Sequence, residues 1–250
     1  MADLSNANSV ERAFAILEML NTSRRGWNVS EISRKLGLPK SSTHVLISTL
    51  CRLAYIKEAG TGRRFQLSAK MYGLGSNALH ATPLPEISLP HMHWAVQQSH
   101  LTSHIGILEK GQIIFIQKVD GPGIIKFDTY LGKCSELHCT GLGKALLAYQ
   151  PEEMVQSLLS KHSFSRFTRN TIPTLAKFVA ELAKVRRDGY AIDDEEEELG
   201  IRCIAVPIFE HGKSVAAVSL TGTTSQLTID GLKTVVQVAQ ATAARISAHL

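Results

Sequence analysis

The sequence predicts an α+β protein in which a small basic helical domain precedes a larger domain, built on an antiparallel sheet flanked by helices. Near the N-terminus, short amphipathic segments are broken by a Gly-Leu-Pro turn, as in packed helices. Residues 1–80 hold 11 Lys or Arg against 5 Asp or Glu, and the remainder holds 16 against 17. Later apolar runs follow one another at the close spacing of antiparallel hairpins, at 104–108 with 112–117 and at 203–209 with 214–221.

The composition is that of a soluble globular protein, with 250 residues, 44% hydrophobic and 20% charged, which is enough for two ordinary domains. No apolar run approaches the roughly 18 to 20 residues that span a bilayer, and the first residues lack the features of a signal peptide. We therefore expect a cytoplasmic protein that does not bind membranes. Four cysteines are too few for a disulfide scaffold and are expected to be reduced: Cys51, Cys134, Cys139 and Cys203.

The first element is predicted to be an amphipathic helix over 9–21. Its polar start is followed by apolar residues at helical spacing, which places them on one face: Val10, Ala13, Phe14, Leu17 and Leu20. A loop over 22–27 that carries Arg24 and Arg25 is expected to connect this helix to the next one.

The segment 28–53 predicts two further helices joined by a tight turn. Asn28 and Glu31 have the spacing of a capping box, so the first of these helices is expected to begin there. Gly37 suits the left-handed end of that helix, and Pro39 suits the first turn of the next. This arrangement is a helix-turn-helix, whose second helix enters the major groove of DNA. The inward face of the second helix is predicted to hold Val45, Leu46, Thr49, Leu50 and Leu53.

Two short strands over 55–57 and 65–67, joined by a Gly-rich loop at 58–64, are predicted to form a hairpin. After a helix-turn-helix, such a hairpin forms a wing that lies along the DNA backbone or in the minor groove, and an ordinary solvated loop is the alternative. The basic charge favours double-stranded operator DNA as a partner, although small domains also vary in charge by chance. The expected DNA-binding residues are Lys40, Ser41, Ser42, Thr43, His44, Arg63 and Arg64.

A Pro-containing break at 82–85 separates the predicted domains. We place the winged helix-turn-helix domain at 1–67, a linker helix and linker at 68–85, and the second domain at 86–250. In the second domain, periodicity predicts helices at 86–99, 141–149, 152–160, 173–187 and 228–249. It predicts strands at 104–108, 112–117, 124–127, 203–209 and 214–221.

A ligand site is predicted at the Gly-rich start of the helix 141–149. Backbone N–H groups and the positive helix dipole at this start suit a carboxylate, whereas glycines that only allow close packing are the alternative. Ser219 and Thr221 alternate on one face of a strand and can donate to a carboxylate or hydroxyl.

The sequence predicts no metal, cofactor or catalytic centre. His91 and His93 point apart on a helix, and no cysteine or carboxylate completes a metal-binding set with them. Cys139 and the adjacent His138 have diverging side chains, which is poor geometry for base-assisted attack. The acidic run 195–198 is expected to be a solvated face, because like charges repel unless exposed. No Ser-His-Asp order, nucleophile elbow or phosphate loop occurs, so we do not expect an enzyme.

Several motifs resemble the IclR family of bacterial transcriptional regulators, and together they span nearly the whole chain. They are Ser-Val-Glu-Arg-Ala-Phe-Ala-Ile-Leu from residue 9, Leu-Gly-Leu-Pro-Lys-Ser-Ser-Thr-His from 36, Gly-Arg-Arg-Phe-Gln-Leu from 62, His-Cys-Thr-Gly-Leu-Gly-Lys-Ala-Leu-Leu from 138, and the segment 189–207. The resemblance implies a winged helix-turn-helix followed by a GAF-like effector domain that binds a small molecule, often an organic acid. It also implies a homodimer or homotetramer.

Carried over residue by residue, the resemblance implies ligand-binding positions at Ile124, Ser135, Gly141, Leu142, Asp193, Cys203, Ser219 and Thr221. At its position Asp193 can accept from ligand hydroxyls, so the resemblance implies a small organic acid, hydroxylated or sugar-derived, as the ligand. The sequence departs from the family at Val45, where recognition helices commonly carry Arg. The expected function is a DNA-binding transcriptional regulator, repressor or activator, whose operator binding is controlled by a small organic acid. Two alternatives remain open. One is a thiol-based redox sensor or cysteine-dependent enzyme on the second domain, and the other is a constitutive DNA binder with a filled core.

Overall fold

The structure is a computed structural model, and it describes residues 4, 6–60, 62–79, 82–160 and 162–250. The chain forms two compact units, Met1–Ala81 and Thr82–Leu250. The division falls within the region 68–85 that we predicted as linker, so the predicted linker helix groups with the first unit. No helix among the described residues is long and apolar enough to cross a membrane.

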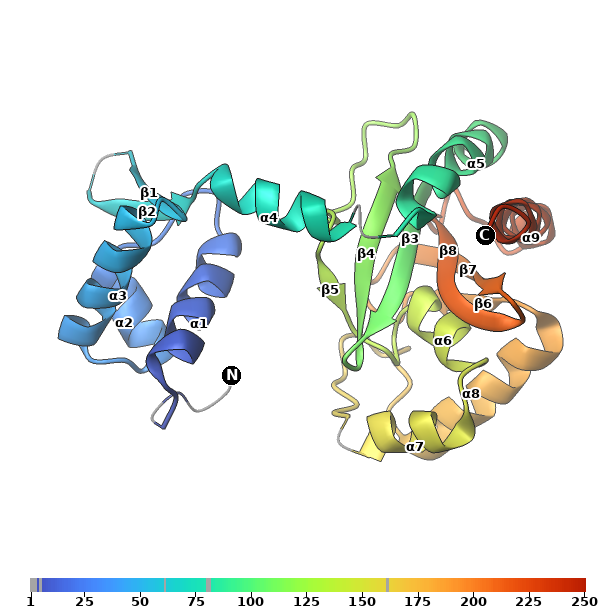
Figure 1. The fold of residues 1–250 in the computed structure, drawn as a ribbon. Coiled ribbons are helices and arrows are strands. Elements are labelled where there is room, and N and C mark those ends of the chain that lie inside the picture. Colours follow the sequence, from blue (N-terminus) through green and yellow to red (C-terminus); the bar gives the residue numbers. More distant parts are fainter. Residues whose placement is uncertain (1–3, 5, 61, 80–81, 161) are drawn as a thin grey trace. The chain divides into compact units, whose positions relative to one another are not determined.

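The first unit consists of short helices that pack together, with a β-hairpin at the edge of the bundle beside α1 and α3 (Figure 1). Its elements are α1 (Ser9–Asn21), α2 (Val29–Leu36), α3 (Lys40–Arg52), β1 (Ile56–Ala59), β2 (Arg64–Leu67) and α4 (Lys70–Leu79). The predicted capping box begins α2, where the Asn28 side chain accepts from the Glu31 N–H and the Glu31 carboxylate accepts from the Asn28 N–H. The helix ends at Gly37, whose φ of 66° is the left-handed conformation that glycine adopts most easily.

The inward face predicted for α3 is partly wrong. The buried residues of this helix are Thr43, Ile47 and Leu50, whereas Val45 is 63% exposed and Leu53 is 44% exposed. Because each residue advances about 100° around a helix, Val45 lies on the side opposite Ile47. Ile47 and Leu50 pack in one core with residues of α1, α2 and β1, namely Ile16, Leu20, Ile32 and Ile56.

The second unit is built on an antiparallel sheet with strand order β5-β4-β3-β8-β7-β6, which confirms the predicted α+β class (Figure 1). Its strands are β3 (Thr102–Glu109), β4 (Gln112–Val119), β5 (Cys134–Ser135), β6 (Ala191–Asp194), β7 (Ile201–Glu210) and β8 (Lys213–Thr223). Its helices are α5 (Leu84–Ser99), α6 (Gly141–Leu147), α7 (Glu152–Ser160), α8 (Leu175–Asp188) and α9 (Leu232–Ser247).

Helices cover both faces of this sheet (Figure 1). α5 and α9 pack against each other and against one face, while α6 and α8 lie over the other face. The core on the α6 side includes Ala205 of β7 and Ala217 of β8. Since side chains alternate along a strand, Cys203 and Ser219, each two residues away, and then Thr221, face the same side as α6.

The strand predicted at 124–127 is wrong. That segment is irregular, and Ile124 is 99% exposed, so its apolar residues do not pair with a neighbouring strand. Two strands that the sequence did not reveal are β5, which pairs with β4, and β6, which pairs with β7. Both are too short for a periodic pattern to indicate them, and β6 carries Asp193.

Candidate functional site

The exposed face of α3 is the candidate DNA-reading surface. Among its residues, Lys40, Ser41 and His44 are exposed, as predicted, and Val45 is exposed beside them. Thr43 is fully buried, and its Oγ1 donates to the Pro39 carbonyl at 3.0 Å. Thr43 therefore packs inside the domain and is not placed to contact bases. Ser42 is half-buried, and Ser48, which the sequence reasoning missed, is exposed one turn after His44.

The two predicted wing arginines lie in different environments. Arg63 is exposed at the turn between β1 and β2, with a φ of 50°. Arg64 instead bonds within the domain, with its Nη2 2.8 Å from Glu31 Oε2 and 3.0 Å from the Gly26 carbonyl. The Asn28 N–H bond and then the Arg64 charge lower the pKa of Glu31. Arg64 thus holds the wing to the start of α2. Thr61 of the predicted wing loop lies outside the described residues.

The second unit contains a cavity of about 490 Å³ on the α6 face of its sheet. Six of the eight predicted ligand-binding residues line it, namely Gly141, Leu142, Asp193, Cys203, Ser219 and Thr221. The remaining lining residues are His104, Phe115, Ile125, Lys126, Phe127, Asp128, Thr129, Lys133, Thr140, Glu197, Glu198 and Ile201. The volume lies within the range of small-molecule pockets.

Two predicted ligand-binding residues lie outside the cavity lining. Ile124 points to solvent, and its neighbour Ile125 lines the cavity instead. In an irregular segment, matching a motif can miss the inward residue by one position. Ser135 donates its Oγ hydrogen to Glu197 Oε1 at 3.0 Å, so it contacts a cavity residue without lining the cavity itself.

Two of the buried groups that line the cavity, His104 and Asp193, have pKa values shifted toward the neutral form. Burial lowers the pKa of His104 to about 3, so this imidazole is neutral at pH 7, and its Nε2 lies 2.8 Å from Thr129 Oγ1. Burial raises the pKa of Asp193 to about 7, although its carboxylate accepts from the Glu196 N–H at 2.8 Å. Near neutral pH, Asp193 is therefore able to act as a hydrogen-bond donor as well as an acceptor.

Two family models match the sequence. One, described as "IclR helix-turn-helix domain", matches residues 9–60, and the other, described as "Bacterial transcriptional regulator IclR C-terminal", matches residues 76–248. The chain belongs to the IclR family. It is a transcriptional regulator with a DNA-binding helix-turn-helix domain and an effector-binding C-terminal domain.

Relatives within the IclR family align with most of the chain. The HTH-type transcriptional regulator KdgR of Escherichia coli is 29% identical over 98% of this chain and 93% of the relative. The solved structure of Thermotoga maritima IclR has a TM-score of 0.77 and 30% identity, covering 97% of this chain and 98% of its own. An IclR homolog from Microbacterium hydrocarbonoxydans, complexed with 4-hydroxybenzoate, shares the fold, with a TM-score of 0.81 and 22% identity over 96% and 98% of the two chains.

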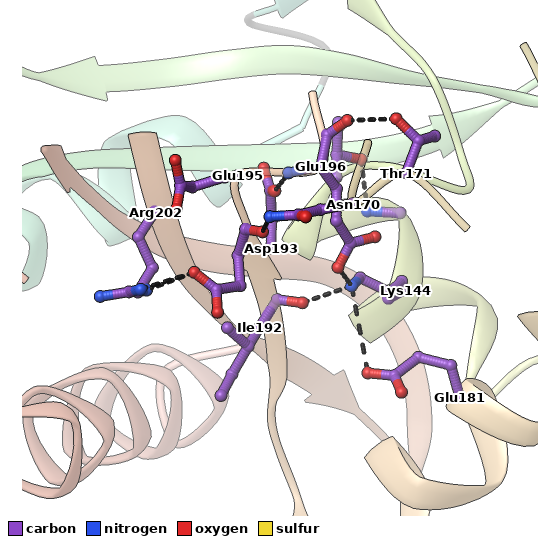
Figure 2. A network of polar contacts seen from close by, with 12 residues as sticks. Lys144, Asn170, Thr171, Glu181, Ile192, Asp193, Glu195, Glu196 and Arg202 are labelled. Carbon is purple, nitrogen blue, oxygen red and sulfur yellow. Dashed lines mark hydrogen bonds and ion pairs between the residues drawn. The ribbon is translucent and has the colours of Figure 1, made fainter. Parts of the chain in front are cut away.

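A buried ion-pair network supports the strand that carries Asp193 in this IclR-family chain (Figure 2). Lys144 of α6 is fully buried, and its Nζ donates to Glu196 Oε1 at 2.5 Å and to the Ile192 carbonyl. Thr171 Oγ1 donates to the Glu196 carbonyl at 2.7 Å. The prediction of a solvated face at 195–198 is therefore wrong for Glu196, because a buried lysine offsets its charge.

The two buried cysteines of the second unit, Cys139 and Cys203, do not have the features of reactive thiols. Burial raises the pKa of Cys139, and burial followed by the Asp193 charge raises the pKa of Cys203 to about 12. Thiols with raised pKa values are poor nucleophiles, since the thiolate is the reactive form. Cys134 is exposed but lies outside the cavity lining. These environments argue against the cysteine-dependent alternative.

Several cavity residues were missed because they depend on strand pairing or on loop conformation. His104 of β3 is opposite Ser219 of β8, so the pairing of two distant segments brings it into the cavity. Lys126 and Thr129 come from the irregular segment before β5. The alternating pattern of β3 shows that His104 shares a face with Gly106, but it does not show which strand lies beside it.

Proposed function

We propose that this IclR-family regulator binds a small hydroxylated organic acid in its C-terminal cavity, and that binding changes its affinity for operator DNA. The observation that carries this proposal is the polar lining of the cavity on the α6 face. Ser219 and Thr221 place hydroxyl groups there beside Asp193, and Lys126 and Lys133 bring positive charge to a lining that also holds the acidic side chains Asp128, Glu197 and Glu198. Hydroxyls and lysines together suit a ligand that carries both a carboxylate and hydroxyl groups.

The raised pKa of Asp193 supports an anionic ligand. A fully ionised carboxylate in the cavity would repel a ligand carboxylate, whereas a pKa of about 7 leaves much of Asp193 protonated near neutral pH. The homologue crystallised with 4-hydroxybenzoate, an acid with one hydroxyl, supports the same ligand class for this chain. An apolar wall that includes Phe115 and Leu142 accommodates the carbon skeleton of such an acid.

For DNA binding, we propose that two winged domains of a homodimer, or of a pair within a homotetramer, occupy successive major grooves of a pseudo-palindromic operator. Ser41, Ser42 and His44 of α3 would contact bases or adjacent phosphates, and Lys40 and Arg63 would contact the backbone. Such a regulator acts in the cytoplasm, where the DNA is. The ligand would favour one relative arrangement of the two winged domains over another. It can change operator affinity only by as much as the ligand's own affinity differs between these two arrangements.

Calorimetric titration of the full chain with sugar acids, keto acids and aromatic hydroxy acids tests the ligand class. We expect one class to bind, and Thr221→Val to weaken that binding by about tenfold, the loss of a hydrogen bond to a charged group. Ser135→Ala is the matched control, since Ser135 lies outside the cavity lining. Equal losses in both variants, or no binding by any acid, would contradict the proposal.

A further inference from the structure

Three potential metal ligands meet at a place outside the effector cavity. Glu136, His138 and His162 bring a carboxylate oxygen and two imidazole nitrogens within 4.8 Å of one another. Glu136 and His138 lie between β5 and α6, while His162 follows α7, so the cluster joins two separate segments of the second unit. The cavity lining includes none of these residues.

Hydrogen bonding fixes the ring of His138 in the orientation and tautomer that are typical of a metal ligand. Its ring is fully buried, and its Nε2 lies 2.9 Å from the carbonyl oxygen of Ser165. A carbonyl only accepts, so Nε2 carries the proton and the lone pair is on Nδ1. That Nδ1 faces His162 Nε2 at 2.8 Å. Metal-binding histidines characteristically donate their second ring N–H to a backbone carbonyl or carboxylate in this way.

The distances and the burial of the cluster suit a cation with one open coordination position. Glu136 Oε2 is 3.7 Å from His162 Nε2. Zinc held by nitrogen at about 2.0–2.1 Å in a tetrahedron separates its ligand atoms by about 3.3 Å. The separations of His138 Nδ1 and of Glu136 Oε2 from His162 Nε2 each differ from this value by about 0.5 Å or less, and all three atoms lie within 4.8 Å of one another, so shifts of at most about 1.5 Å close the site. The rings of Phe164 and Phe167 pack against His138 on the buried side. The Glu136 side chain is 44% exposed, which leaves access for the ion and a water.

We propose that Glu136, His138 and His162 form a binding site for a zinc-type divalent cation, with water as the fourth ligand. Two imidazoles and one carboxylate with an open position are a donor set that zinc uses in proteins. The sequence predicted no metal site, because His138 and His162 are 24 residues apart and no local spacing pattern joins them.

The cation would stabilise the wall of the effector cavity. Thr140, which lines the cavity and caps α6, donates its Oγ1 hydrogen to the Glu136 carbonyl at 2.6 Å. On the second segment, Thr168 Oγ1 donates to the carbonyl of Glu195 at 2.6 Å, next to the buried Glu196. A metal that joins Glu136 and His138 to His162 would therefore connect the start of α6 to the loop that supports Asp193.

Zinc titration of the chelator-treated, dialysed full chain tests the site directly. Calorimetry is expected to show one zinc ion bound per chain, and cobalt is expected to bind with the visible absorption of a tetrahedral complex. Glu136→Gln and His162→Gln should each weaken zinc binding by at least about tenfold, since each removes one of three protein ligands. At the same zinc concentration, zinc should also raise the thermal midpoint of the wild-type protein more than that of the variants.

His93→Gln is the matched control, because His93 is an exposed histidine outside the cluster. This variant should bind zinc as the wild type does. Glu136→Gln keeps the test decisive if His162→Gln fails to fold, because the Glu136 side chain is only half-buried and glutamine has nearly the same shape. Unchanged zinc affinity in Glu136→Gln, an equal loss in His93→Gln, or no binding at one equivalent to the folded wild type would each overturn the proposal. The last result would leave the two histidines as a metal-free hydrogen-bonded pair.

Discussion

Replacing Lys144 with methionine is expected to destabilise the C-terminal unit by about 3–5 kcal/mol at neutral pH. Lys144 is fully buried, and its ammonium contacts Glu196 Oε1 at 2.5 Å and Glu181 Oε1 at 4.0 Å (Figure 2). Methionine fills a similar volume, so the loss comes mainly from the charge. The substitution leaves the buried Glu196 carboxylate without its cation, and its Oε2 has no hydrogen-bond partner among the described residues.

The cost should depend on pH in a defined direction. Burial raises the pKa of Glu196, and Lys144 opposes that shift. Without Lys144, the folded-state pKa of Glu196 rises further above its unfolded value. A carboxyl group whose pKa is higher in the folded state than in the unfolded state costs no stability at a pH below its unfolded-state pKa. It destabilises the fold as the pH rises through its folded-state pKa. Lys144→Met should therefore be less harmful at about pH 5 than at about pH 7.5.

Urea unfolding followed by circular dichroism measures this effect, with separate transitions fitted for the two units. Lys184→Met is the control, because Lys184 pairs with Glu181 at 3.8 Å on the surface and should contribute at most about 1 kcal/mol. Adding Glu196→Gln to Lys144→Met should recover part of the loss, since the uncompensated charge is removed. A loss below about 1 kcal/mol for Lys144→Met, or equal losses in the two lysine variants, would refute the reasoning.

Three further predictions concern the two sites. His44→Ala should weaken operator binding by about 1–3 kcal/mol without lowering stability, because His44 is exposed on the DNA-reading face. Thr43→Val should lower stability by about 1 kcal/mol and leave base preference unchanged, because Thr43 is buried. DNA titration and urea unfolding measure both effects, and the reverse pattern would contradict the assignment of the α3 faces. Lys40→Ala should reduce the slope of log affinity against log salt by about one, and an unchanged slope would show that Lys40 does not contact phosphate. Acid binding should weaken by up to about tenfold per pH unit above about 7 as Asp193 ionises, and Asp193→Asn should remove this dependence in calorimetry at several pH values.

Local signals in the sequence predicted the elements of the first unit but not which side chains its helices bury, since Val10 and Phe14, predicted on the apolar face of α1, are 64% and 60% exposed. Three features of this unit depend only on residues close together in the chain, and the structure contains all three. They are the Asn28 capping box, the left-handed backbone of Gly37 and the hairpin after α3. The sequence alone does not decide which face of α3 is buried, because Val45 and Ile47 are both apolar. Only packing against α1 and α2 decides that Ile47 is buried and Val45 is exposed.

The effector cavity was predictable only where a motif carried the information. Gly141, Leu142 and Asp193 were identified by resemblance, and strand alternation placed Ser219 and Thr221 together. The other residues depend on long-range pairing or irregular backbone, which no local pattern specifies. The buried partner of Glu196 illustrates the limit. Four consecutive acidic residues indicate a solvated run, and Lys144, distant in sequence, makes one of them part of the core.

Operator binding by the full chain, with and without a bound acid, tests the central claim most directly. A mobility-shift titration would use the DNA upstream of the regulator's own gene and a panel of sugar, keto and aromatic acids. We predict that the protein shifts this DNA at moderate salt and that one class of acid releases or remodels the complex. A shift that no acid alters, together with absence of acid binding in calorimetry, would contradict effector control. No shift at moderate salt would contradict the DNA-binding assignment of α3.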